Sequence, residues 1–433
     1  MGIFIGLGSG TPTSSYDYFY GVEIDTANAT TVATRVGRPE LHVTCPIQNK
    51  MRRCVLKDDG SVAYYLDDND STKTSGGGTA DLSGAAGQVM VEIPDHYRRF
   101  EFEGTVIRPL ISEYPLPGFD LVPKMYISAY EATVERETQK LASVCNKTAA
   151  YRGGNNNAAH DADETGKSQL GVPATVISLT NFRTYAQKRG AGWQCYTYKA
   201  HVTLFWLFVI EYATTNCQAA YNAEKTPEGY RQGGLGAGVT TLTWGPWSTM
   251  NGNYPFIPCG HTNSLGNKTG VVNFDMPSGY GSSLTVEVPS YHGVENLFGH
   301  LWKWTDGVLF DIQSATGGGE SRAYAALDPA DYNSTNFSKY QYIGNLPRTE
   351  GYVKELMFGE RGDMLPKSVG GSSSTFWSDY FYTNIPKDGT ALRGLLLGGH
   401  AHNGSFAGLA FANSSYAPSD TLASFGSRLC FLA

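Results

Sequence analysis

Two histidines near the C-terminus, His400 and His402, are separated by one residue, a spacing that occurs in metal sites. A zinc ion takes three protein ligands in a catalytic site and four in a structural site. The sequence offers no third ligand beside this pair, and the stretch GLGSG near the N-terminus lacks the lysine of a phosphate-binding loop. We therefore expect no metal and no cofactor.

Seven cysteines could in principle supply a nucleophile, a redox pair or a disulfide framework. Their number is odd, they are widely scattered, and no two of them form a CxxC pair, which argues against a disulfide framework or a zinc site and favours assembly in a reducing cytosol. Spacing alone also identifies no Ser/His/Asp or paired-carboxylate set, because triads are defined by geometry. The cysteines are Cys45, Cys54, Cys145, Cys195, Cys217, Cys259 and Cys430.

Bulky and polar side chains recur at irregular spacing close to the C-terminus. The spacing fits neither a helix nor a strand, and glycines and small residues separate the bulky ones, which indicates side chains presented on a surface. Aromatic residues dominate binding hot spots because they bring a large rigid area. By residue type alone, the core is the commoner place for Phe and Leu. The candidates are Tyr380, Tyr382, His400, His402, Phe406, Phe411, Tyr416, Asp420, Leu422 and Phe425, and Trp377 beside them is expected to be buried.

Two helices are predicted upstream of this segment. The first covers Leu179 to Gly190, with Thr180 or Asn181 as its cap and Gly190 as its stop signal. The second covers His201 to Asn222 and is almost entirely apolar at its start, so we expect it to be buried in the core. Its apolar run is too short to cross a membrane.

Short strands and loops are predicted for the rest of the chain. Apolar runs between Val22 and Asp70, with a hairpin signal at Asp59-Gly60, predict a mostly β N-terminal region. The stretch from Ser71 to Gln88 is rich in Gly, Ser, Ala and Thr and predicts a linker or an exposed loop. Strands are expected after it in VMVEIPDHYRRFEFEG, KMYISAY, GVTTLTW, SLTVEVP, GVLFDIQ and RLCFL.

The bulk properties exclude several classes of function. The 433 residues carry a net charge of −7 and contain no block of Lys and Arg, so nucleic acid is not expected as a partner. The first residues, MGIFIGLGSGTPTSS, have neither the basic start nor the apolar run of a signal peptide, and no membrane insertion is expected. A hydrophobic content of 41% is sufficient for real cores.

Four stretches of the chain together resemble a known family. They are MYISAYEATVERE, LTNFRTYAQKRGAGWQ, LFWLFVIEYATTNCQ and the C-terminal RGLLLGGHAHNGSFAGLAFANSSYAPSDTLASFGSRLCFL. The combination resembles the C-type-lectin-fold variable proteins of diversity-generating retroelements, and more narrowly the tail-fibre receptor-binding proteins of phages of gut bacteria, of the tropism-determinant type. The likeness extends from about Val89 to the C-terminus and, more weakly, over RVGRPELHVTCPIQNKMRRCVLKDDGSVAYYLD.

The resemblance implies an α+β fold: a C-type-lectin-like (formylglycine-generating-enzyme-like) domain with two helices and short strands, preceded by a small mostly β region. We expect an attachment or oligomerisation region at 1–70, a linker or loop at 71–88 and the lectin-like domain at 89–433, with a variable segment at about 376–427. The resemblance also implies that the candidate side chains are presented to a ligand, with Leu422 and Phe425 left open between surface and core.

The family diversifies AAC codons at their adenines, and such codons never become Lys, Glu, Gln, Met or Trp. None of these five residues occurs between Gly394 and Ala433. The resemblance thus implies a receptor-binding adhesin of the virion, a homotrimer that is assembled in the host cytoplasm, joins other tail proteins and binds a host cell-surface protein or glycan. Two alternatives remain open: an enzyme of the formylglycine-generating type, disfavoured because no cysteine pair lies near the C-terminus, and a structural decoration protein of the virion.

Overall fold

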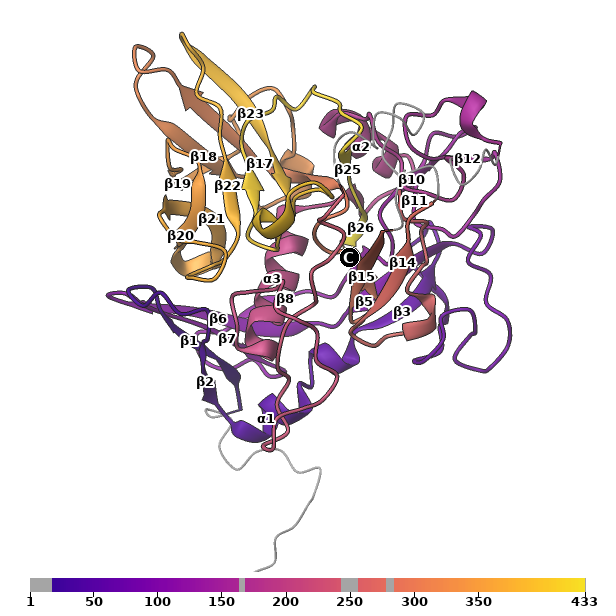
Figure 1. Ribbon diagram of the computed structural model, residues 1–433, viewed down its shortest axis with the longest axis horizontal. Helices are drawn as coiled ribbons and strands as arrows, with labels where there is room; N and C mark the ends of the chain where they lie inside the picture. Colours follow the sequence, from indigo (N-terminus) through magenta and orange to yellow (C-terminus); the bar gives the residue numbers. More distant parts are fainter. Residues whose placement is uncertain (1–17, 163–167, 243–255, 278–283, 433) are drawn as a thin grey trace, which may run out of the picture.

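The computed structural model describes residues 18–162, 168–242, 256–277 and 284–432, and this part of the chain is mostly β with three α-helices (Figure 1). The C-type-lectin-like arrangement and the division into domains stay predictions.

The helices α2 and α3 occur where the sequence predicts them. Helix α2 (Leu179–Gln187) begins after Ser178, whose side chain accepts a hydrogen bond from the Asn181 amide, so the cap precedes the residues expected to serve as one. Helix α3 (Tyr198–Tyr212) ends well before Asn222. It stops because Ala213 takes a left-handed conformation, and the Thr215 amide then donates to the Thr31 carbonyl at 2.9 Å instead of to a carbonyl of the helix. The short helix α1 (Pro39–Thr44) was not predicted.

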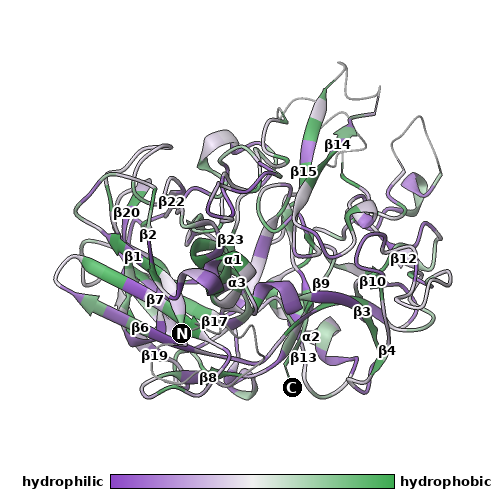
Figure 2. Cartoon of the chain, turned by 90° about the horizontal axis from the view of Figure 1, so that it is seen from below, coloured by the Kyte–Doolittle hydropathy of each residue, from purple (hydrophilic) through white to green (hydrophobic). Residues whose placement is uncertain are grey.

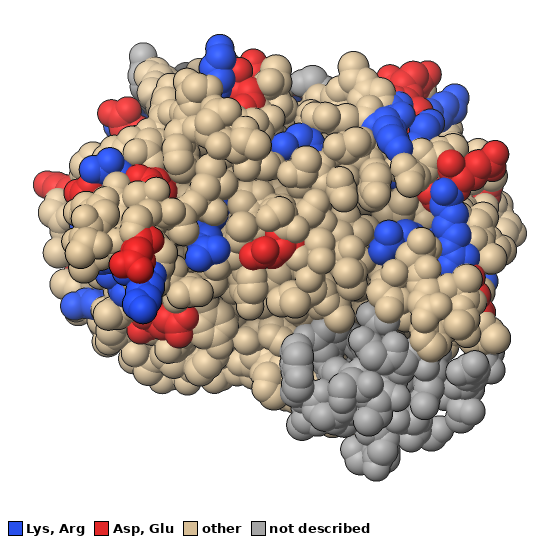
Figure 3. Space-filling model, turned by 90° about the horizontal axis from the view of Figure 1, so that it is seen from above, with Lys and Arg blue, Asp and Glu red and all other residues tan. Residues whose placement is uncertain are grey.

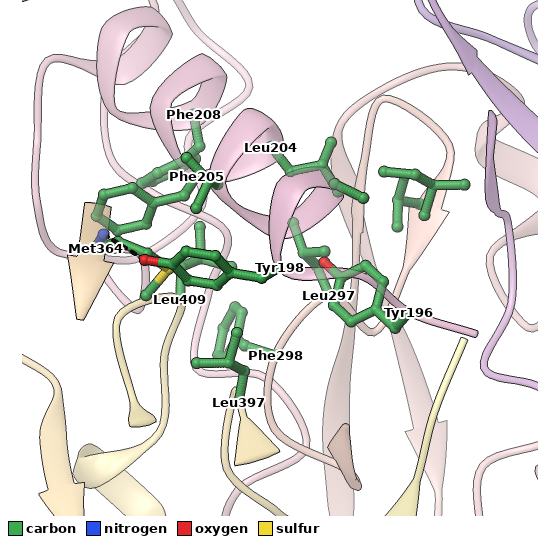
Figure 4. Packing of buried hydrophobic residues seen from close by; sticks show 14 of the residues in the cluster. Tyr196, Tyr198, Leu204, Phe205, Phe208, Leu297, Phe298, Met364, Leu397 and Leu409 are labelled. Atoms are coloured by element: carbon green, nitrogen blue, oxygen red, sulfur yellow. Dashed lines mark hydrogen bonds between the residues drawn. The ribbon is translucent and has the colours of Figure 1, made fainter. Parts of the chain in front are cut away.

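Helix α3 forms the centre of the core. It lies in the middle of the molecule, between the largest sheet and the sheet that contains β3 and β5 (Figure 1), and in the view from below it lies among the strands near the centre (Figure 2). Figure 4 shows Leu204, Phe205 and Phe208 packed among residues of distant segments, including Leu397 and Leu409. Nearly every residue of α3 is buried, which explains why its apolar run has no polar face.

A six-stranded antiparallel sheet joins the beginning, the middle and the end of the chain, in the order β13-β26-β9-β5-β3-β4. The C-terminal strand β26 is therefore an inner strand rather than a frayed end. The buried Arg428 beside it donates to the carbonyls of Ser128 and Asn296 at 3.1 and 2.7 Å. The strands are β3 (Arg52–Leu56), β4 (Val62–Tyr65), β5 (Gln88–Ile93), β9 (Met125–Ser128), β13 (Trp193–Cys195) and β26 (Leu429–Leu432).

The segment 71–88, predicted as a linker or exposed loop, connects β4 to β5, and β3 pairs with both strands of this connection. Its first residue, Ser71, is buried and accepts a hydrogen bond from the Arg53 guanidinium at 3.0 Å. The segment also contains a turn closed by a bridge between Lys73 and Thr79.

A five-stranded antiparallel sheet contains the first described strands, in the order β2-β1-β7-β6-β8. Two small three-stranded sheets, β11-β10-β12 and β14-β15-β16, complete the periphery. The strands are β1 (Tyr20–Asp25), β2 (Thr34–Gly37), β6 (His96–Glu103), β7 (Val106–Ser112), β8 (Asp120–Val122), β10 (Thr133–Glu135), β11 (Leu141–Ala142), β12 (Tyr151–Arg152), β14 (Gly270–Asp275), β15 (Thr285–Tyr291) and β16 (Val294–Glu295).

The largest sheet has nine strands and carries the candidate segment. Its order is β19-β18-β17-β23-β24-β22-β20-β21, with β25 paired to β17. The long central pair β17 and β23 is antiparallel, whereas β24 and β22 run parallel. The strands are β17 (Trp302–Gln313), β18 (Ser321–Ala325), β19 (Gln341–Asn345), β20 (Gly351–Phe358), β21 (Asp363–Val369), β22 (Tyr380–Tyr382), β23 (Thr390–Leu397), β24 (Ala412–Asn413) and β25 (Phe425–Gly426).

One expected strand is absent. In GVTTLTW, residues 238–242 form no strand, because Gly238 takes a positive φ of 70° and the Leu242 amide bonds to the Ala401 carbonyl at 2.8 Å. Thr243 and Trp244 lie outside the described residues. The segment is therefore attached to the C-terminal candidate region rather than to a sheet of its own.

Candidate binding face

Four aromatic side chains from three separate segments meet at one end of the nine-stranded sheet. Tyr380 and Tyr382 are on β22, Phe406 is on the 3-10 turn Gly404–Phe406 that follows β23, and Tyr352 is at the start of β20. Strand β24 lies between β23 and β22 and fixes the spacing of these segments. We name these four residues the aromatic cluster.

The rings of the aromatic cluster are in direct contact. Tyr380 and Phe406 are stacked, with centroids 4.2 Å apart and planes 17° apart. Tyr352 meets both rings edge-on, at 5.1 and 5.4 Å, and Tyr382 lies 5.3 Å from Tyr380. The Tyr352 hydroxyl also lies 3.1 Å from the Ser405 hydroxyl. All four side chains are half-buried, so each ring presents an edge or face to solvent while the rest packs.

Burial affects the titration of the tyrosines in this cluster. It raises the pKa of Tyr382 to about 12, with the charge of Glu350 as a second cause, and it raises the pKa of Tyr380 as well. Both phenols are therefore neutral at physiological pH and can donate a hydrogen bond to a ligand.

His400 and His402 lie beside the aromatic cluster. His400 is 6.2 Å from the Trp302 ring and 6.2 Å from His402. His402 is exposed and donates from Nδ1 to the Leu242 carbonyl at 3.1 Å. Burial, and then the neighbouring His402, lowers the pKa of His400 to about 3, so this ring is neutral. Among the described residues, no group of three His, Cys, Asp or Glu side chains could hold a metal ion.

Phe411 does not belong to the exposed part of this face. It is fully buried, 4.5 Å from the Trp302 ring and 5.2 Å from Tyr382. This corrects the expectation that Phe411 is presented: strand β24 begins directly after it and directs the ring into the core. Phe411 supports the aromatic cluster from behind.

The remaining candidates form a second group at the loop that leads to β25. Phe425 is buried against Trp304, at 5.5 Å, and Tyr416, at 4.8 Å, so the open question about Phe425 is settled in favour of the core. Asp420 accepts a hydrogen bond from the Ala417 amide and closes a turn, and Leu422 is 41% exposed. No ring contact between described residues joins this group to the aromatic cluster.

A buried carboxyl group, Asp379, fixes the turn between Phe406 and Phe411. It accepts a hydrogen bond from the Ala410 amide at 2.7 Å, and its own carbonyl accepts one from the Val353 amide at 2.8 Å. A Cβ atom on Gly408 would lie 2.0 Å from the Asp379 carboxylate, so only glycine fits there. Burial raises the pKa of Asp379 well above its usual range, which favours the neutral acid.

Two buried polar groups lie beneath the face: His201 contacts this turn, and Lys303 lies on β17, the strand paired with β23. His201 of α3 donates from Nε2 to the Leu409 carbonyl at 2.7 Å, and its Nδ1 accepts from the Tyr196 hydroxyl at 3.0 Å. Burial lowers the pKa of His201 to about 4. On the other side, Lys303 of β17 forms a buried ion pair with Glu131 at 3.0 Å.

The face is therefore a set of half-exposed rings on a rigid support. Sequence reasoning identified Tyr380, Tyr382, His400, His402 and Phe406, which the structure brings together. It missed Tyr352 and Asp379. Tyr352 lies in an ordinary strand, where nothing in the sequence signals its role, whereas Asp379 belongs to the triplet WSD, whose acidic residue in an apolar context was a usable signal.

The cysteines show no sign of reactivity. Burial raises the pKa of all seven thiols, to about 12 for Cys430 and to about 11 for Cys145. A nucleophilic cysteine needs a lowered pKa, because the thiolate is the reactive form. The arrangement thus offers contact area and neutral hydrogen-bond donors rather than a nucleophile.

One face of the molecule shows charged side chains of both signs (Figure 3). On the face drawn in Figure 3, Lys and Arg lie interspersed with Asp and Glu, and much of the surface between them is uncharged. In the described part of the chain, no helix is long and apolar enough to cross a membrane.

No protein-family model and no curated protein sequence matches the chain. Among solved structures, the chain is similar to proteins of the tropism-determinant class. These structures are variants of Major Tropism Determinant: P3c at 13% identity and a TM-score of 0.28, M1 at 13% and 0.25, and U1 at 11% and 0.23. Each comparison covers 92% of this chain and 88% of the other. This is the type of protein that the sequence pattern resembles, although TM-scores of this size do not establish a common fold.

Proposed function

We propose that the protein is a phage receptor-binding adhesin that presents the aromatic cluster to a host cell-surface protein or glycan. The observation that carries the proposal is the contact of Tyr352, Tyr380, Tyr382 and Phe406, half-exposed and drawn from three segments of the chain. Rigid aromatic rings with polar tips give binding area at a low entropy cost.

The support beneath the rings fits a surface whose residues change. Asp379, Gly408, His201 and Lys303 hold the backbone through buried contacts that do not involve the presented rings. Exchange of Phe406, His400 or His402 would therefore alter the face without removing its support. We propose that the segment 376–427 is diversified by a retroelement, on a lectin-like scaffold within residues 89–433.

Adhesion through weak sites gains strength from avidity, so we propose a homotrimer on the virion tail, attached to other tail proteins. Mass measurement of the purified chain tests this: a stable monomer would contradict it. The formylglycine-generating alternative receives no support from the thiols, whose pKa values are all raised by burial. The decoration-protein alternative predicts no binding to host cells.

Two experiments test the proposal. The first compares binding of the labelled protein to a panel of gut bacteria with that of the variant Tyr380→Ser/Phe406→Ser. Tyr342→Ser is the matched control, because it removes an exposed aromatic side chain outside both the cluster and the segment 376–427. We expect the double variant to lose binding while its melting transition and the control's binding persist. Equal binding by all three proteins would refute the assignment of the face.

The second experiment examines the genome. A reverse-transcriptase gene beside this one, with a repeat that matches the last codons except at adenines, is expected. A genomic region without such a repeat would count against diversification of the segment, but it would not contradict the proposed binding face.

A further inference from the structure

A small cavity lies at the turn of the β20–β21 hairpin, whereas the aromatic cluster lies at the opposite end of β20. Its lining includes Arg98 of β6, Lys199 at the start of α3, and Arg361 and Asp363 of the hairpin turn, around a cavity of about 260 Å³. Tyr352 of the aromatic cluster lies near the start of β20, and Phe358 beside the cavity ends this strand. The length of the strand between them places the cavity about 20 Å from the cluster.

Positive charge exceeds negative charge in the lining of this cavity. Three cations face one carboxylate, Asp363, which forms a long ion pair with Arg361 at 3.6 Å. Among the described residues, no ion pair of 4 Å or less is formed by Arg98 or Lys199. The charges of Asp363 and then Asp120 act on Arg98, and that of Asp328 acts on Lys199, only from further away.

The pKa values agree with an excess of positive charge. Burial, and then the charge of Arg98, lowers the pKa of Lys199, and burial lowers the pKa of Arg98. Burial also raises the pKa of Asp363, although the charge of Arg361 lowers it. The first turn of the 15-residue helix α3 adds the positive end of its dipole at Lys199.

The rim of the cavity is apolar. Leu121 of β8 and Leu327 after β18 are 53% and 57% exposed, and the buried Val202 of α3 lines the same space. The Tyr198 hydroxyl accepts a hydrogen bond from the Met364 amide, which fixes the hairpin turn against α3 (Figure 4). The two exposed leucines lie beside two cations, Arg98 and Lys199, that form no ion pair among the described residues. This combination suits a ligand that has both an anionic and an apolar part.

We propose that this cavity, the Arg98–Lys199 pocket, binds a carboxylate carried on a short apolar body. Its volume is below the range of pockets for drug-sized ligands, so the apolar part is small. A free aliphatic carboxylate and the C-terminal residue of a peptide share this chemistry. The site is independent of the aromatic cluster and of adhesion.

Ligand-observed NMR and calorimetry on the full-length protein test the pocket, with hexanoate against hexanamide and N-acetyl-leucine against its amide. We expect one or both carboxylates to bind, with dissociation constants of about millimolar size for ligands so small, and the neutral amides to bind at least tenfold more weakly. Binding by hexanoate alone indicates a free carboxylate as the natural ligand, and binding by N-acetyl-leucine alone indicates a peptide terminus.

Variants separate the charge from the apolar rim. Lys199→Gln should weaken hexanoate binding about tenfold, and Lys367→Gln, which removes an exposed charge from β21 outside the pocket, should leave it within twofold. Leu327→Ser, at an exposed position that folding does not require, should weaken hexanoate but not acetate. The proposal is overturned if hexanamide binds as well as hexanoate, if Lys199→Gln and Lys367→Gln behave alike, or if no carboxylate binds.

Discussion

Acidification should destabilise this protein through its buried neutral histidines, and His201 is the clearest case. Its Nδ1 accepts a hydrogen bond from Tyr196 and its Nε2 donates to Leu409, so the folded protein needs the neutral ring. Burial lowers its pKa from 6.5 to about 4. Because the folded pKa lies below the unfolded one, the stabilisation is complete above pH 6.5 and is lost as the pH falls toward 4.

The size of the effect follows from the two pKa values. At a pH of about 5.5, protonated His201 outnumbers the neutral form by roughly ten to one in the unfolded chain, while the folded ring stays neutral. The free energy of unfolding is therefore lower by about 1.4 kcal/mol for this one histidine. His42 and His96, with pKa values lowered to about 4, and His400, lowered to about 3, act in the same direction. Asp363 and Asp379, whose pKa values burial raises, act in the opposite direction.

A comparison of the wild type with a His201 variant separates the contribution of His201 from those of the other titrating groups. Urea unfolding of the wild type and of His201→Gln at pH values of about 7.5 and 5.5 gives four free energies of unfolding. The advantage of the wild type over the variant should shrink by about 1.4 kcal/mol on acidification. Equal differences at both pH values, or ring-nitrogen NMR shifts that show His201 titrating near 6.5, would refute the reasoning.

Three further predictions concern the turn at Gly408, the buried ion pair of Arg183 with Asp306, and the cysteines. Gly408→Ala places a Cβ atom 2.0 Å from the buried Asp379 carboxylate and should cost more than about 2 kcal/mol in unfolding free energy, with loss of cell binding; wild-type stability would contradict the contact. Arg183→Ala leaves Asp306 buried without its two-point partner, at 2.5 and 2.8 Å, and should cost about 3–5 kcal/mol by denaturant unfolding, whereas Lys367→Ala, at an exposed site, should cost less than about 0.5 kcal/mol. The five buried thiols, Cys45, Cys54, Cys195, Cys217 and Cys430, should resist Ellman's reagent until denaturant is added, whereas Cys145 and Cys259 are partly exposed; a reaction of more than two thiols in the native protein would contradict this burial.

Several strands and the two long helices were predictable because their signals are local, whereas most strands of the nine-stranded sheet were not predicted. The apolar run after His201 gave the buried helix α3, and Asp59-Gly60 gave the β3–β4 hairpin. Helix ends were less predictable. After α3 ends, the Thr215 amide bonds to the Thr31 carbonyl, a contact between segments far apart in the sequence.

The candidate face was predictable in part. The irregular spacing of His400, His402 and Phe406 correctly distinguished them from a helix or strand face, but the same criterion included Phe411, which is buried. The register of β24 decides which of these rings faces solvent, and that register depends on pairing with β22 and β23. Tyr352 joins the cluster through the β20–β22 pairing, which the sequence does not reveal.

A photo-crosslinking experiment addresses the binding face most directly. A benzophenone amino acid replaces Phe406 in one protein and Tyr342, an exposed aromatic residue on the edge strand β19, in another, and both are irradiated on bacteria that bind the wild type. We predict a crosslinked host-surface molecule from position 406 and none from position 342. The opposite pattern would contradict the assignment of the aromatic cluster as the binding face.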